Sequence, residues 1–431
     1  MRIGTMRLAD RLIGVPVCFA LTAWRKLTEL PVRRGEAAQR NPGKILFIKL
    51  AEQGATVLAY PAIEEARRMV GRENVYFLVF DDNRPILDAM DVIPERNVIT
   101  IPTASIPKAV AGAVRAIREV RRLGVDVTVD CEFFARSSAA LAYLSGAVTR
   151  IGYHAFAGEA HYRGDLLTHR INYNPFLHVS AAYWVMVKAA RMDPRHLPAL
   201  DTDLPEALDL APSFRPRSDE IAAVRDLLGR LSGGGPAGPV VLLNANCSDL
   251  LPVRRWPPER YVRLAGLLLE SRPDVTVIFT GARGEADAVE ELAGSIGSNR
   301  CFSLAGRTSM RELLTLYTLA DVLVTNDSGP AQFASLTPVR VVTLFGPETP
   351  VLFAARSPRN FVLSSGLPCS PCVNAYNDRK SPCRDNLCMQ RISVRQVFDL
   401  VIGLCDHKDE PLTVQEGIVS PDCAKGPHDN P

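Results

Sequence analysis

The sequence predicts an α/β protein made of two Rossmann-like domains, each built on a doubly wound parallel sheet. In both halves of the chain, short β-branched runs alternate with amphipathic helical segments, a pattern typical of parallel strands joined by crossover helices. A stretch rich in Pro, Gly and charge separates the two halves. The length of 431 residues also exceeds that of one ordinary hydrophobic core.

The composition is that of a globular protein, with 47% apolar and 23% charged residues. A net charge of +3 is too small to indicate a nucleic-acid partner. We therefore expect five parts along the chain. They are an N-terminal segment (1–40), a first domain (41–205), a linker region (206–238), a second domain (239–405) and a polar tail (406–431).

The first domain begins with a buried strand followed by a polar loop, 51–55, and a helix that ends at Gly71. A second helix is strongly amphipathic. The expected strands are 44–50, 75–80, 98–101 and 125–130, and the expected helices are 56–70 and 107–123.

The second domain repeats this alternation, and one further helix, 218–231, is expected within the linker region. The expected strands are 240–243, 275–280, 322–324 and 339–344, and the expected helices include 259–270 and 309–319.

The stretch 320–350 carries two turns at the carboxyl ends of expected strands. The first turn is Asn326-Asp327-Ser328-Gly329-Pro330, and the second contains Gly346 and Thr349. Pro330 suits the first turn of a short helix, 331–335, and a helix start exposes N–H groups that can bind a phosphate. In open α/β sheets, ligands bind at these strand ends. An ordinary capped helix is the competing interpretation.

The N-terminal segment contains 13 largely apolar residues, 12–24, which is shorter than the about 20 that a membrane-spanning helix needs. Arg7 and Arg11 precede this run, and Arg25, Lys26, Arg33 and Arg34 follow it. Cationic flanks around an apolar run that ends in Trp24 are typical of an interfacial membrane anchor. Packing on the globular body, or an uncleaved signal-like stretch, are the alternatives.

Four of the ten cysteines form the one dense thiol group of the sequence, in a loop spanning 369–388. Cys369, Cys372, Cys383 and Cys388 could hold a structural zinc ion, because four thiolates suit tetrahedral coordination. Partial disulfides and reduced thiols remain open. Since no convincing cleavable signal is present, we expect reduced thiols in the cytoplasm.

Several motifs together resemble the bacterial heptosyltransferase family, glycosyltransferase family 9. Five parts of the sequence are similar to motifs of that family. They are the strand and loop of 44–55 with Tyr60-Pro61-Ala62, the Arg254-Arg255-Trp256-Pro257 motif, the turns at 325–330 and 344–350, and the Cys-rich segment 369–389. Their combination and order, spread over residues 44–400, carry the resemblance.

The resemblance implies a GT-B fold, in which two Rossmann-like domains face a central cleft. The C-terminal domain would hold a nucleotide-diphospho-sugar donor, and the N-terminal domain would hold a glycan or lipid-linked acceptor. The family transfers sugars, typically heptose, onto the lipopolysaccharide core with inversion. It acts at the cytoplasmic face of the inner membrane, where an N-terminal anchor would make peripheral contact. No cofactor is required for such catalysis.

This reaction needs donors and cations that stabilise the departing diphosphate. The N–H groups around Ser328 and Gly329 are candidates, as are the Thr349 hydroxyl and the cations of Arg254 and Arg255. The other residues expected at the donor site are Asn246, Ser248, Gly281 and Glu285.

The sequence departs from the family at two positions. The family usually carries an Asp after the loop glycine, where it is thought to act as base, but Ala55 stands there. Glu52 is the substitute carboxylate, with Gln53 and Gly54 completing the acceptor-side loop. Gln332 occupies a second position, where the family often has His. A catalytically degenerate nucleotide-sugar-binding protein and a sugar-nucleotide epimerase are therefore alternatives to an inverting glycosyltransferase.

Overall fold

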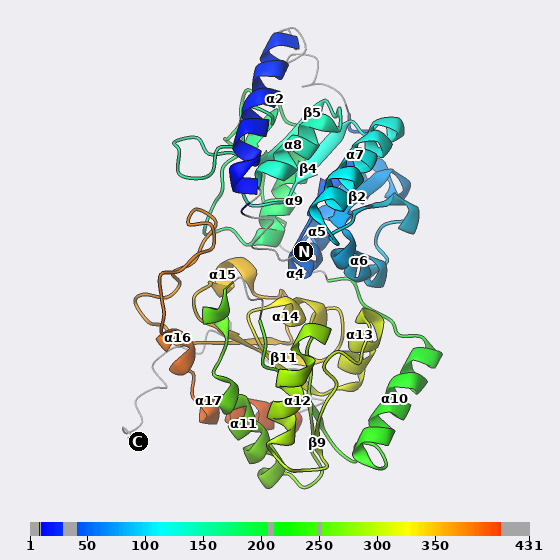
Figure 1. The fold of residues 1–431 in the computed structure, drawn as a ribbon, viewed down its shortest axis with the longest axis vertical. Helices are drawn as coiled ribbons and strands as arrows, with labels where there is room; N and C mark the ends of the chain where they lie inside the picture. The colour runs from blue at the N-terminus through cyan, green and yellow to red at the C-terminus, as the bar shows by residue number, and fades with distance from the viewer. Residues whose placement is uncertain (1–7, 9, 29–40, 206–210, 248–250, 407–431) are drawn as a thin grey trace. The chain divides into compact units, whose positions relative to one another are not determined.

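The computed structural model describes residues 8, 10–28, 41–205, 211–247 and 251–406 (Figure 1). Ser248, the tail beyond Asp406, and Arg7, Arg33 and Arg34 of the basic flanks lie outside these ranges. The chain divides into two compact units. The first comprises Met1–Pro212 and Asn374–Arg379, and the second comprises Ser213–Val373 and Lys380–Pro431.

The sheet of the first unit has six parallel strands in the order β3-β2-β1-β4-β5-β6, the doubly wound arrangement that the sequence predicts. Its central strand is apolar throughout and fully buried, as expected of a strand covered on both faces. The strands are β1 Ile45–Ile48, β2 Val75–Phe80, β3 Val98–Ile101, β4 Val127–Asp130, β5 Thr149–Tyr153 and β6 His169–Ile171.

One predicted helix of the first unit is in fact two. The expected helix 56–70 is divided at Ala59, because Pro61 lies in the first turn of a new helix and has no N–H to continue the previous one. The first part begins at Gln53, so most of the predicted loop 51–55 is helical. The helices are α2 Gly14–Thr28, α4 Gln53–Leu58, α5 Tyr60–Val70, α6 Arg84–Met90, α7 Ile106–Leu123, α8 Arg136–Leu144 and α9 Val179–Ala189.

The sheet of the second unit repeats the same topology, in the order β12-β11-β10-β7-β8-β9, and all its strand pairs are parallel. The strands are β7 Val240–Asn244, β8 Thr276–Phe279, β9 Cys301–Ser303, β10 Val322–Asn326, β11 Arg340–Phe345 and β12 Asn360–Ser364. Because parallel strands end at one edge, the loops after β7, β8, β10 and β11 gather there.

The helix expected within the linker region is α10, and it belongs to the second unit. The helices of this unit are α10 Ser218–Ser232, α11 Pro258–Ser271, α12 Ala286–Gly294, α13 Met310–Leu319, α14 Gly329–Ala334, α15 Pro350–Phe353, α16 Leu387–Gln390 and α17 Val394–Asp406.

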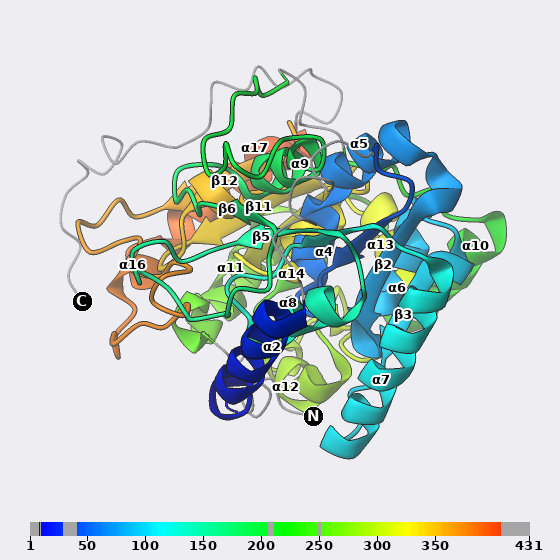
Figure 2. The ribbon, with the colours of Figure 1, turned by 90° about the horizontal axis from the view of Figure 1, so that it is seen from above.

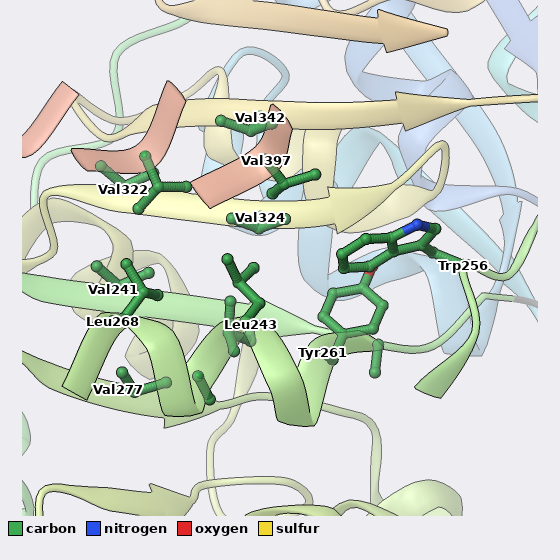
Figure 3. Close-up of a cluster of buried hydrophobic side chains, with 14 of the residues drawn as sticks. Val241, Leu243, Trp256, Tyr261, Leu268, Val277, Val322, Val324, Val342 and Val397 are labelled. Carbon is green, nitrogen blue, oxygen red and sulfur yellow. The ribbon is translucent and has the colours of Figure 1, made fainter. Parts of the chain in front are cut away.

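The core of the second unit packs Trp256 at the carboxyl ends of the strands. Figure 3 shows the Trp256 ring against Tyr261, with strand residues such as Leu243 and Val324 nearby. The two rings meet edge to face, with centroids 4.9 Å apart, and both side chains are fully buried. The indole N–H donates to the Ile392 carbonyl at 2.8 Å. Trp256 therefore joins the loop after β7 to the chain before α17.

Helix α2 lies against α8 in the first unit, as Figures 1 and 2 both show. Gly164, in the loop between β5 and β6, has a φ of +69° and lets that loop lie close to α2, because a Cβ there would be only 2.8 Å from the Cys18 carbonyl oxygen. Within the described ranges, no helix combines the length and the apolar character that crossing a bilayer requires.

Replacing Trp256 by Ala removes a fully buried indole and its hydrogen bond to Ile392. We expect the free energy of unfolding to fall by about 3–5 kcal/mol in chemical denaturation. Trp24→Ala is the matched control, because that ring is 62% exposed on α2 and its loss should have little effect. Equal effects of the two substitutions would contradict this account of the core.

Candidate functional site

Asn326 cross-links the loops at the carboxyl edge of the second sheet. Its side chain is fully buried, and its Oδ1 accepts from the Trp256 backbone N–H at 2.9 Å. Its Nδ2 donates to the carbonyls of Ala245 and Asn246 at 3.1 and 3.2 Å. This amide holds β10 to the loop after β7. We expect it to order the donor site through these backbone contacts.

The turn that follows β10 leads into a short helix, as predicted, but its Ser328 hydroxyl does not bond to the helix N–H groups. Ser328 stands at the N-cap of α14, yet its Oγ donates to the Asn326 carbonyl at 3.1 Å and does not cap the helix. Pro330 lies in the first turn, as predicted. A Cβ on Gly329 would approach the Phe333 ring to 2.8 Å, so packing favours glycine there. Because α14 has only six residues, its dipole contributes little charge to this edge.

Cations supply the positive charge at this edge. Arg254 lies 3.6 Å from Asp327, Nη1 to Oδ2, and both side chains are largely buried. The buried Arg254 Nε finds no hydrogen-bond partner among the described residues. Arg255 donates from Nη2 to the Cys247 carbonyl at 3.1 Å. Burial raises the pKa of the Cys247 thiol, and the charges of Arg254 and Arg255 partly offset that rise. Both guanidinium groups therefore lie near Cys247, in the loop after β7.

Asn246, Gly281 and Glu285 meet at the ends of β7 and β8. A Cβ on Gly281 would lie 3.2 Å from Asn246 Nδ2 and 3.2 Å from Glu285 Oε2. The buried Asn246 Nδ2 has no hydrogen-bond partner in the described part of the chain, so it is a donor open to a ligand. Glu285 accepts from the Ala282 N–H at 2.7 Å and so also stabilises its own turn.

The turn after β11 is fixed mainly by packing. A Cβ on Gly346 would lie 2.5 Å from the Met389 sulfur. A glycine at this position therefore leaves room for α16 to pack against the end of β11. The Thr349 hydroxyl accepts from the Val351 N–H at 3.3 Å and caps α15. Glu348, in the same turn, was not among the predicted site residues, and its carboxylate is only 1% exposed.

The acceptor-side loop of the first unit is organised by a buried lysine. Lys49 is fully buried, and its Nζ contacts Glu132 at 2.9 Å and Glu52 at 3.1 Å. Burial by itself would lower the pKa of the ammonium, but Glu132 and Glu52 together hold that pKa above its usual value. The other carboxylate oxygen of Glu132 accepts from the N–H groups of Leu50 and Ala51 at 2.7 and 3.2 Å.

Glu52 itself adopts the left-handed backbone conformation, with a φ of 69°, just before α4. The carbonyl of Glu52 accepts from the Ala55 N–H at 2.9 Å, and Gln53 Nε2 donates to the Asp82 carbonyl at 2.6 Å. Gly54 lies in the first turn of α4. The Glu52 carboxylate also forms an ion pair with Arg379, a residue that the sequence analysis did not connect with this loop.

A second buried ion pair, also missed, lies beside this loop at the end of β4. Asp130 pairs with Arg163 and accepts from Ser138 Oγ at 2.9 Å. Burial raises the pKa of Asp130, while Arg163 opposes that rise. The Asp130 carboxylate accepts from the Glu132 N–H at 3.1 Å, so it helps to place Glu132.

The cysteines of the loop 369–388 do not form a metal-binding group among the described residues. Within the described ranges, no three His, Cys, Asp or Glu side chains are arranged to hold a metal ion. Cys372 shares a hydrogen bond with Ser381 at 3.2 Å, and the Cys383 thiol donates to the Asp385 carbonyl at 2.8 Å. Burial raises the pKa of Cys388, and the other three thiols add to that rise. The described structure therefore gives the expected zinc ion no support.

Comparison with known proteins decides the family. Residues 114–381, more than half of the chain, match the family model described as glycosyltransferase family 9 (heptosyltransferase). The chain belongs to glycosyltransferase family 9. The predicted resemblance to this family is thus confirmed.

Low sequence identities mark the chain as a divergent member of family 9. It is 23% identical over 316 residues to lipooligosaccharide heptosyltransferase 2 of Haemophilus ducreyi, which covers 71% of this chain and 84% of the relative. It is 30% identical over 102 residues to lipopolysaccharide heptosyltransferase 2 of Salmonella typhimurium, covering 23% of this chain. The match spans only 29% of that relative's length.

Solved structures agree on the fold. Heptosyltransferase II of E. coli superposes with a TM-score of 0.65 at 18% identity, covering 85% of this chain and all of that one. A family 9 glycosyltransferase from Veillonella parvula DSM 2008 gives a TM-score of 0.64 at 17% identity, covering 86% of this chain and 98% of that one. The predicted GT-B class is confirmed.

Replacing Glu132 by Ala would remove one partner of the buried Lys49 ammonium and the acceptor of two N–H groups. We expect the free energy of unfolding to fall by about 3 kcal/mol in urea denaturation, because a buried charge loses its main neutralising contact. Glu95→Ala, which alters a side chain 86% exposed, should have little effect. A Glu132 variant as stable as the Glu95 variant would contradict this role.

Proposed function

We propose that this protein is an inverting glycosyltransferase that uses a nucleotide-diphospho-sugar as donor. Its acceptor is a cell-envelope glycan of the lipopolysaccharide-core type, and heptose or another hexose-type sugar is transferred. Membership of family 9 supports the reaction class. The single observation that carries the proposal is the group at the carboxyl edge of the second sheet, where Arg254, Arg255 and the open Asn246 amide gather.

The donor site must stabilise the charge that develops on the departing diphosphate. Arg254 and Arg255 offer planar guanidinium groups that suit phosphate oxygens, and the Asn246 amide adds a donor. The N–H groups of the turn at 327–329 and the Thr349 hydroxyl complete the proposed set. Asp327 would orient Arg254, which it contacts. Glu285, which lies close to Gly281, would accept from a ribose hydroxyl. With two arginines at the phosphates, we propose transfer without a metal ion.

Glu52 is the proposed base on the acceptor side. As the acceptor oxygen bonds to the anomeric carbon, the bond from that carbon to the phosphate oxygen breaks. The hydroxyl proton passes to the Glu52 carboxylate, and the nucleoside diphosphate leaves with the bonding electron pair. A single displacement of this kind inverts the anomeric configuration. Gln53 and Gly54 form the loop that carries the base.

A nucleotide-sugar-binding protein without chemistry is the alternative. Ala55 has no proton-accepting group, and Glu52 is already engaged by Lys49 and Arg379. Only turnover separates this alternative from the leading proposal, since both bind the donor.

We also propose that α2 attaches the protein to the cytoplasmic face of the inner membrane. This helix packs Cys18 and Leu21 against the protein, yet it also buries polar groups there and leaves most of its large apolar side chains exposed. Arg25, expected as a cationic flank, is instead buried and paired with Asp165. Thr22 accepts from the Asp165 N–H at 2.9 Å, on the same inner face.

The outward face carries large apolar side chains that no described element covers. They are Leu12, Ile13, Phe19, Trp24 and Leu27, with exposed fractions of 65, 60, 67, 62 and 83%. Exposed Arg11 and Lys26 lie at the two ends of this face. An apolar stripe with cationic ends and a Trp fits the boundary between acyl chains and anionic headgroups. A lipid-linked acceptor would be reached at the same surface.

The donor site can be tested with Arg254→Ala. Losing one charged hydrogen-bonding partner of the diphosphate should weaken donor binding about 10- to 100-fold in isothermal titration calorimetry. Arg283→Ala, which removes an exposed arginine near the same edge, is the control and should leave the Kd near the wild-type value. Unchanged affinity of the Arg254 variant would refute the proposed site.

Glu52→Gln separates the enzyme from the binding protein. An amide cannot take the proton, so kcat should fall about 10²- to 10⁴-fold while donor affinity is kept. Turnover is measured as released nucleoside diphosphate, and donor affinity by calorimetry. Full activity of the Gln variant would remove Glu52 from the chemistry, and a wild-type protein that binds donor without turnover would favour the alternative.

Membrane contact can be tested by flotation with vesicles that contain phosphatidylglycerol. Phe19→Asp places a charge in the middle of the apolar face and should reduce binding at least about tenfold. Val110→Asp is the matched control, because Val110 is 59% exposed on α7, away from that face. Equal flotation of the two variants would remove the attachment role of α2.

A further inference from the structure

The six residues Asn374–Arg379, here called the strap, pack with the first unit although the chain on both sides belongs to the second. The strap has its own internal framework. The Asn374 side-chain oxygen accepts from the N–H groups of Tyr376 and Asn377 at 2.9 and 3.1 Å. The Asn374 carbonyl accepts from the Arg379 N–H at 3.0 Å. These bonds fold the strap into a closed turn that ends at Arg379.

Besides Arg379, which pairs with Glu52, Tyr376 and Asp378 of the strap contact other residues of the first unit. The Tyr376 hydroxyl donates to the Tyr173 carbonyl at 2.7 Å, and the two rings meet edge to face with centroids 5.1 Å apart. Tyr376 also lies against the Phe134 ring, at 6.1 Å. Next along the strap, Asp378 Oδ1 lies 3.2 Å from His161 Nε2. The rings of Tyr173 and Phe134 and the contact with His161 therefore hold the turn just before Arg379.

Backbone strain is concentrated around the strap. Five described residues other than glycine have positive φ, and Asp91, which ends α6, is the only one of them away from this place. The other four are Glu52, Phe134, Asp378 and Arg379, with φ of 69, 52, 60 and 51°. Two of these lie in the strap, and the other two contact it. Strained backbone persists only where the surroundings hold it, and it gathers at functional sites.

The strap brings a second cation to the Glu52 carboxylate. Arg379 Nη1 contacts Oε1, while Lys49 Nζ contacts Oε2 at 3.1 Å. With one cation on each oxygen, the carboxylate cannot rotate freely. Among the charged and titratable groups around Glu52, Lys49 and Arg379 are in contact with it, and Glu132 and Tyr183 lie nearby.

We propose that Arg379 is a positioning residue for transfer, which holds the Glu52 carboxylate aimed at the acceptor hydroxyl. This inference rests on the proposed role of Glu52 as base. Glu52 has a strained backbone conformation, and Lys49 contacts only one oxygen of its carboxylate. Arg379 of the strap contacts the other oxygen. A segment distant in the sequence thus completes the acceptor-side site.

Arg379→Gln tests this role through steady-state kinetics. We expect kcat to fall about tenfold with the donor KM unchanged, because the base is misplaced while the donor site is intact. The acid limb of the kcat profile should move to higher pH, since a carboxylate that loses a neighbouring cation takes up a proton more readily. Arg379→Lys should recover part of kcat, because it keeps the charge but not the planar fork.

Arg384→Gln is the matched control, an exposed arginine in the same loop region. It should leave kcat and the pH profile as in the wild type. An Arg379→Gln enzyme that behaves like this control would overturn the proposal. A rise in kcat would overturn it as well, because it would show that the strap blocks the base.

Combining the substitutions separates positioning from general support of the fold. If Arg379 acts through Glu52, Arg379→Gln should cost nothing further in the Glu52→Gln background. A second tenfold loss there would show an independent role and overturn the inference. A wild-type protein without transfer activity would refute the proposed function itself, whereas an active wild type with an unaffected Arg379 variant would refute only this inference.

Discussion

The buried ammonium of Lys49 is the constraint on which the first unit's candidate site depends. A fully buried cation is tolerated only with close anionic partners, and Glu132 and Glu52 are those partners. Glu132 uses its second oxygen for the N–H groups of Leu50 and Ala51, so the lysine fixes the path of the chain as it leaves β1. Glu52 is thereby placed at the start of α4, where Arg379 reaches it. The position of the proposed base therefore follows from one desolvated charge.

In the second unit, an uncharged side chain, the amide of Asn326, fixes the loop at the candidate site. The buried amide of Asn326 bonds to three backbone groups of the loop after β7, and Trp256 in the same loop is bonded to the Ile392 carbonyl. In the proposed donor site, these contacts would leave Arg254, Arg255 and the Asn246 amide to bind the diphosphate. A hydrogen-bonded amide is well suited to this task, because it supplies both a donor and an acceptor without adding charge next to a diphosphate. Each unit thus orients its polar groups from a buried anchor at the carboxyl edge of its sheet.

The sequence predicted much of this fold because local patterns determine it. The runs 75–80 and 98–101 coincide with β2 and β3, since a fully buried strand is a continuous apolar run with clear ends. The division of one helix at Ala59 was missed, although Pro61 is a local signal for it. The inward orientation of Arg25 was not predicted, because it depends on tertiary packing. Glu132 and Arg379 were missed for a related reason. They lie 80 and 327 residues from Glu52, and only the folded chain brings them to Lys49 and Glu52.

The most direct test of the account is calorimetric titration of the wild-type protein with nucleoside diphosphates and their sugars. The series compared are those of ADP, UDP, GDP and dTDP. Each titration is repeated with EDTA. The account predicts saturable binding to at least one donor, with the same affinity after chelation, because Arg254 and Arg255 supply the charge. Absence of binding to every donor, or binding abolished by EDTA, would contradict it.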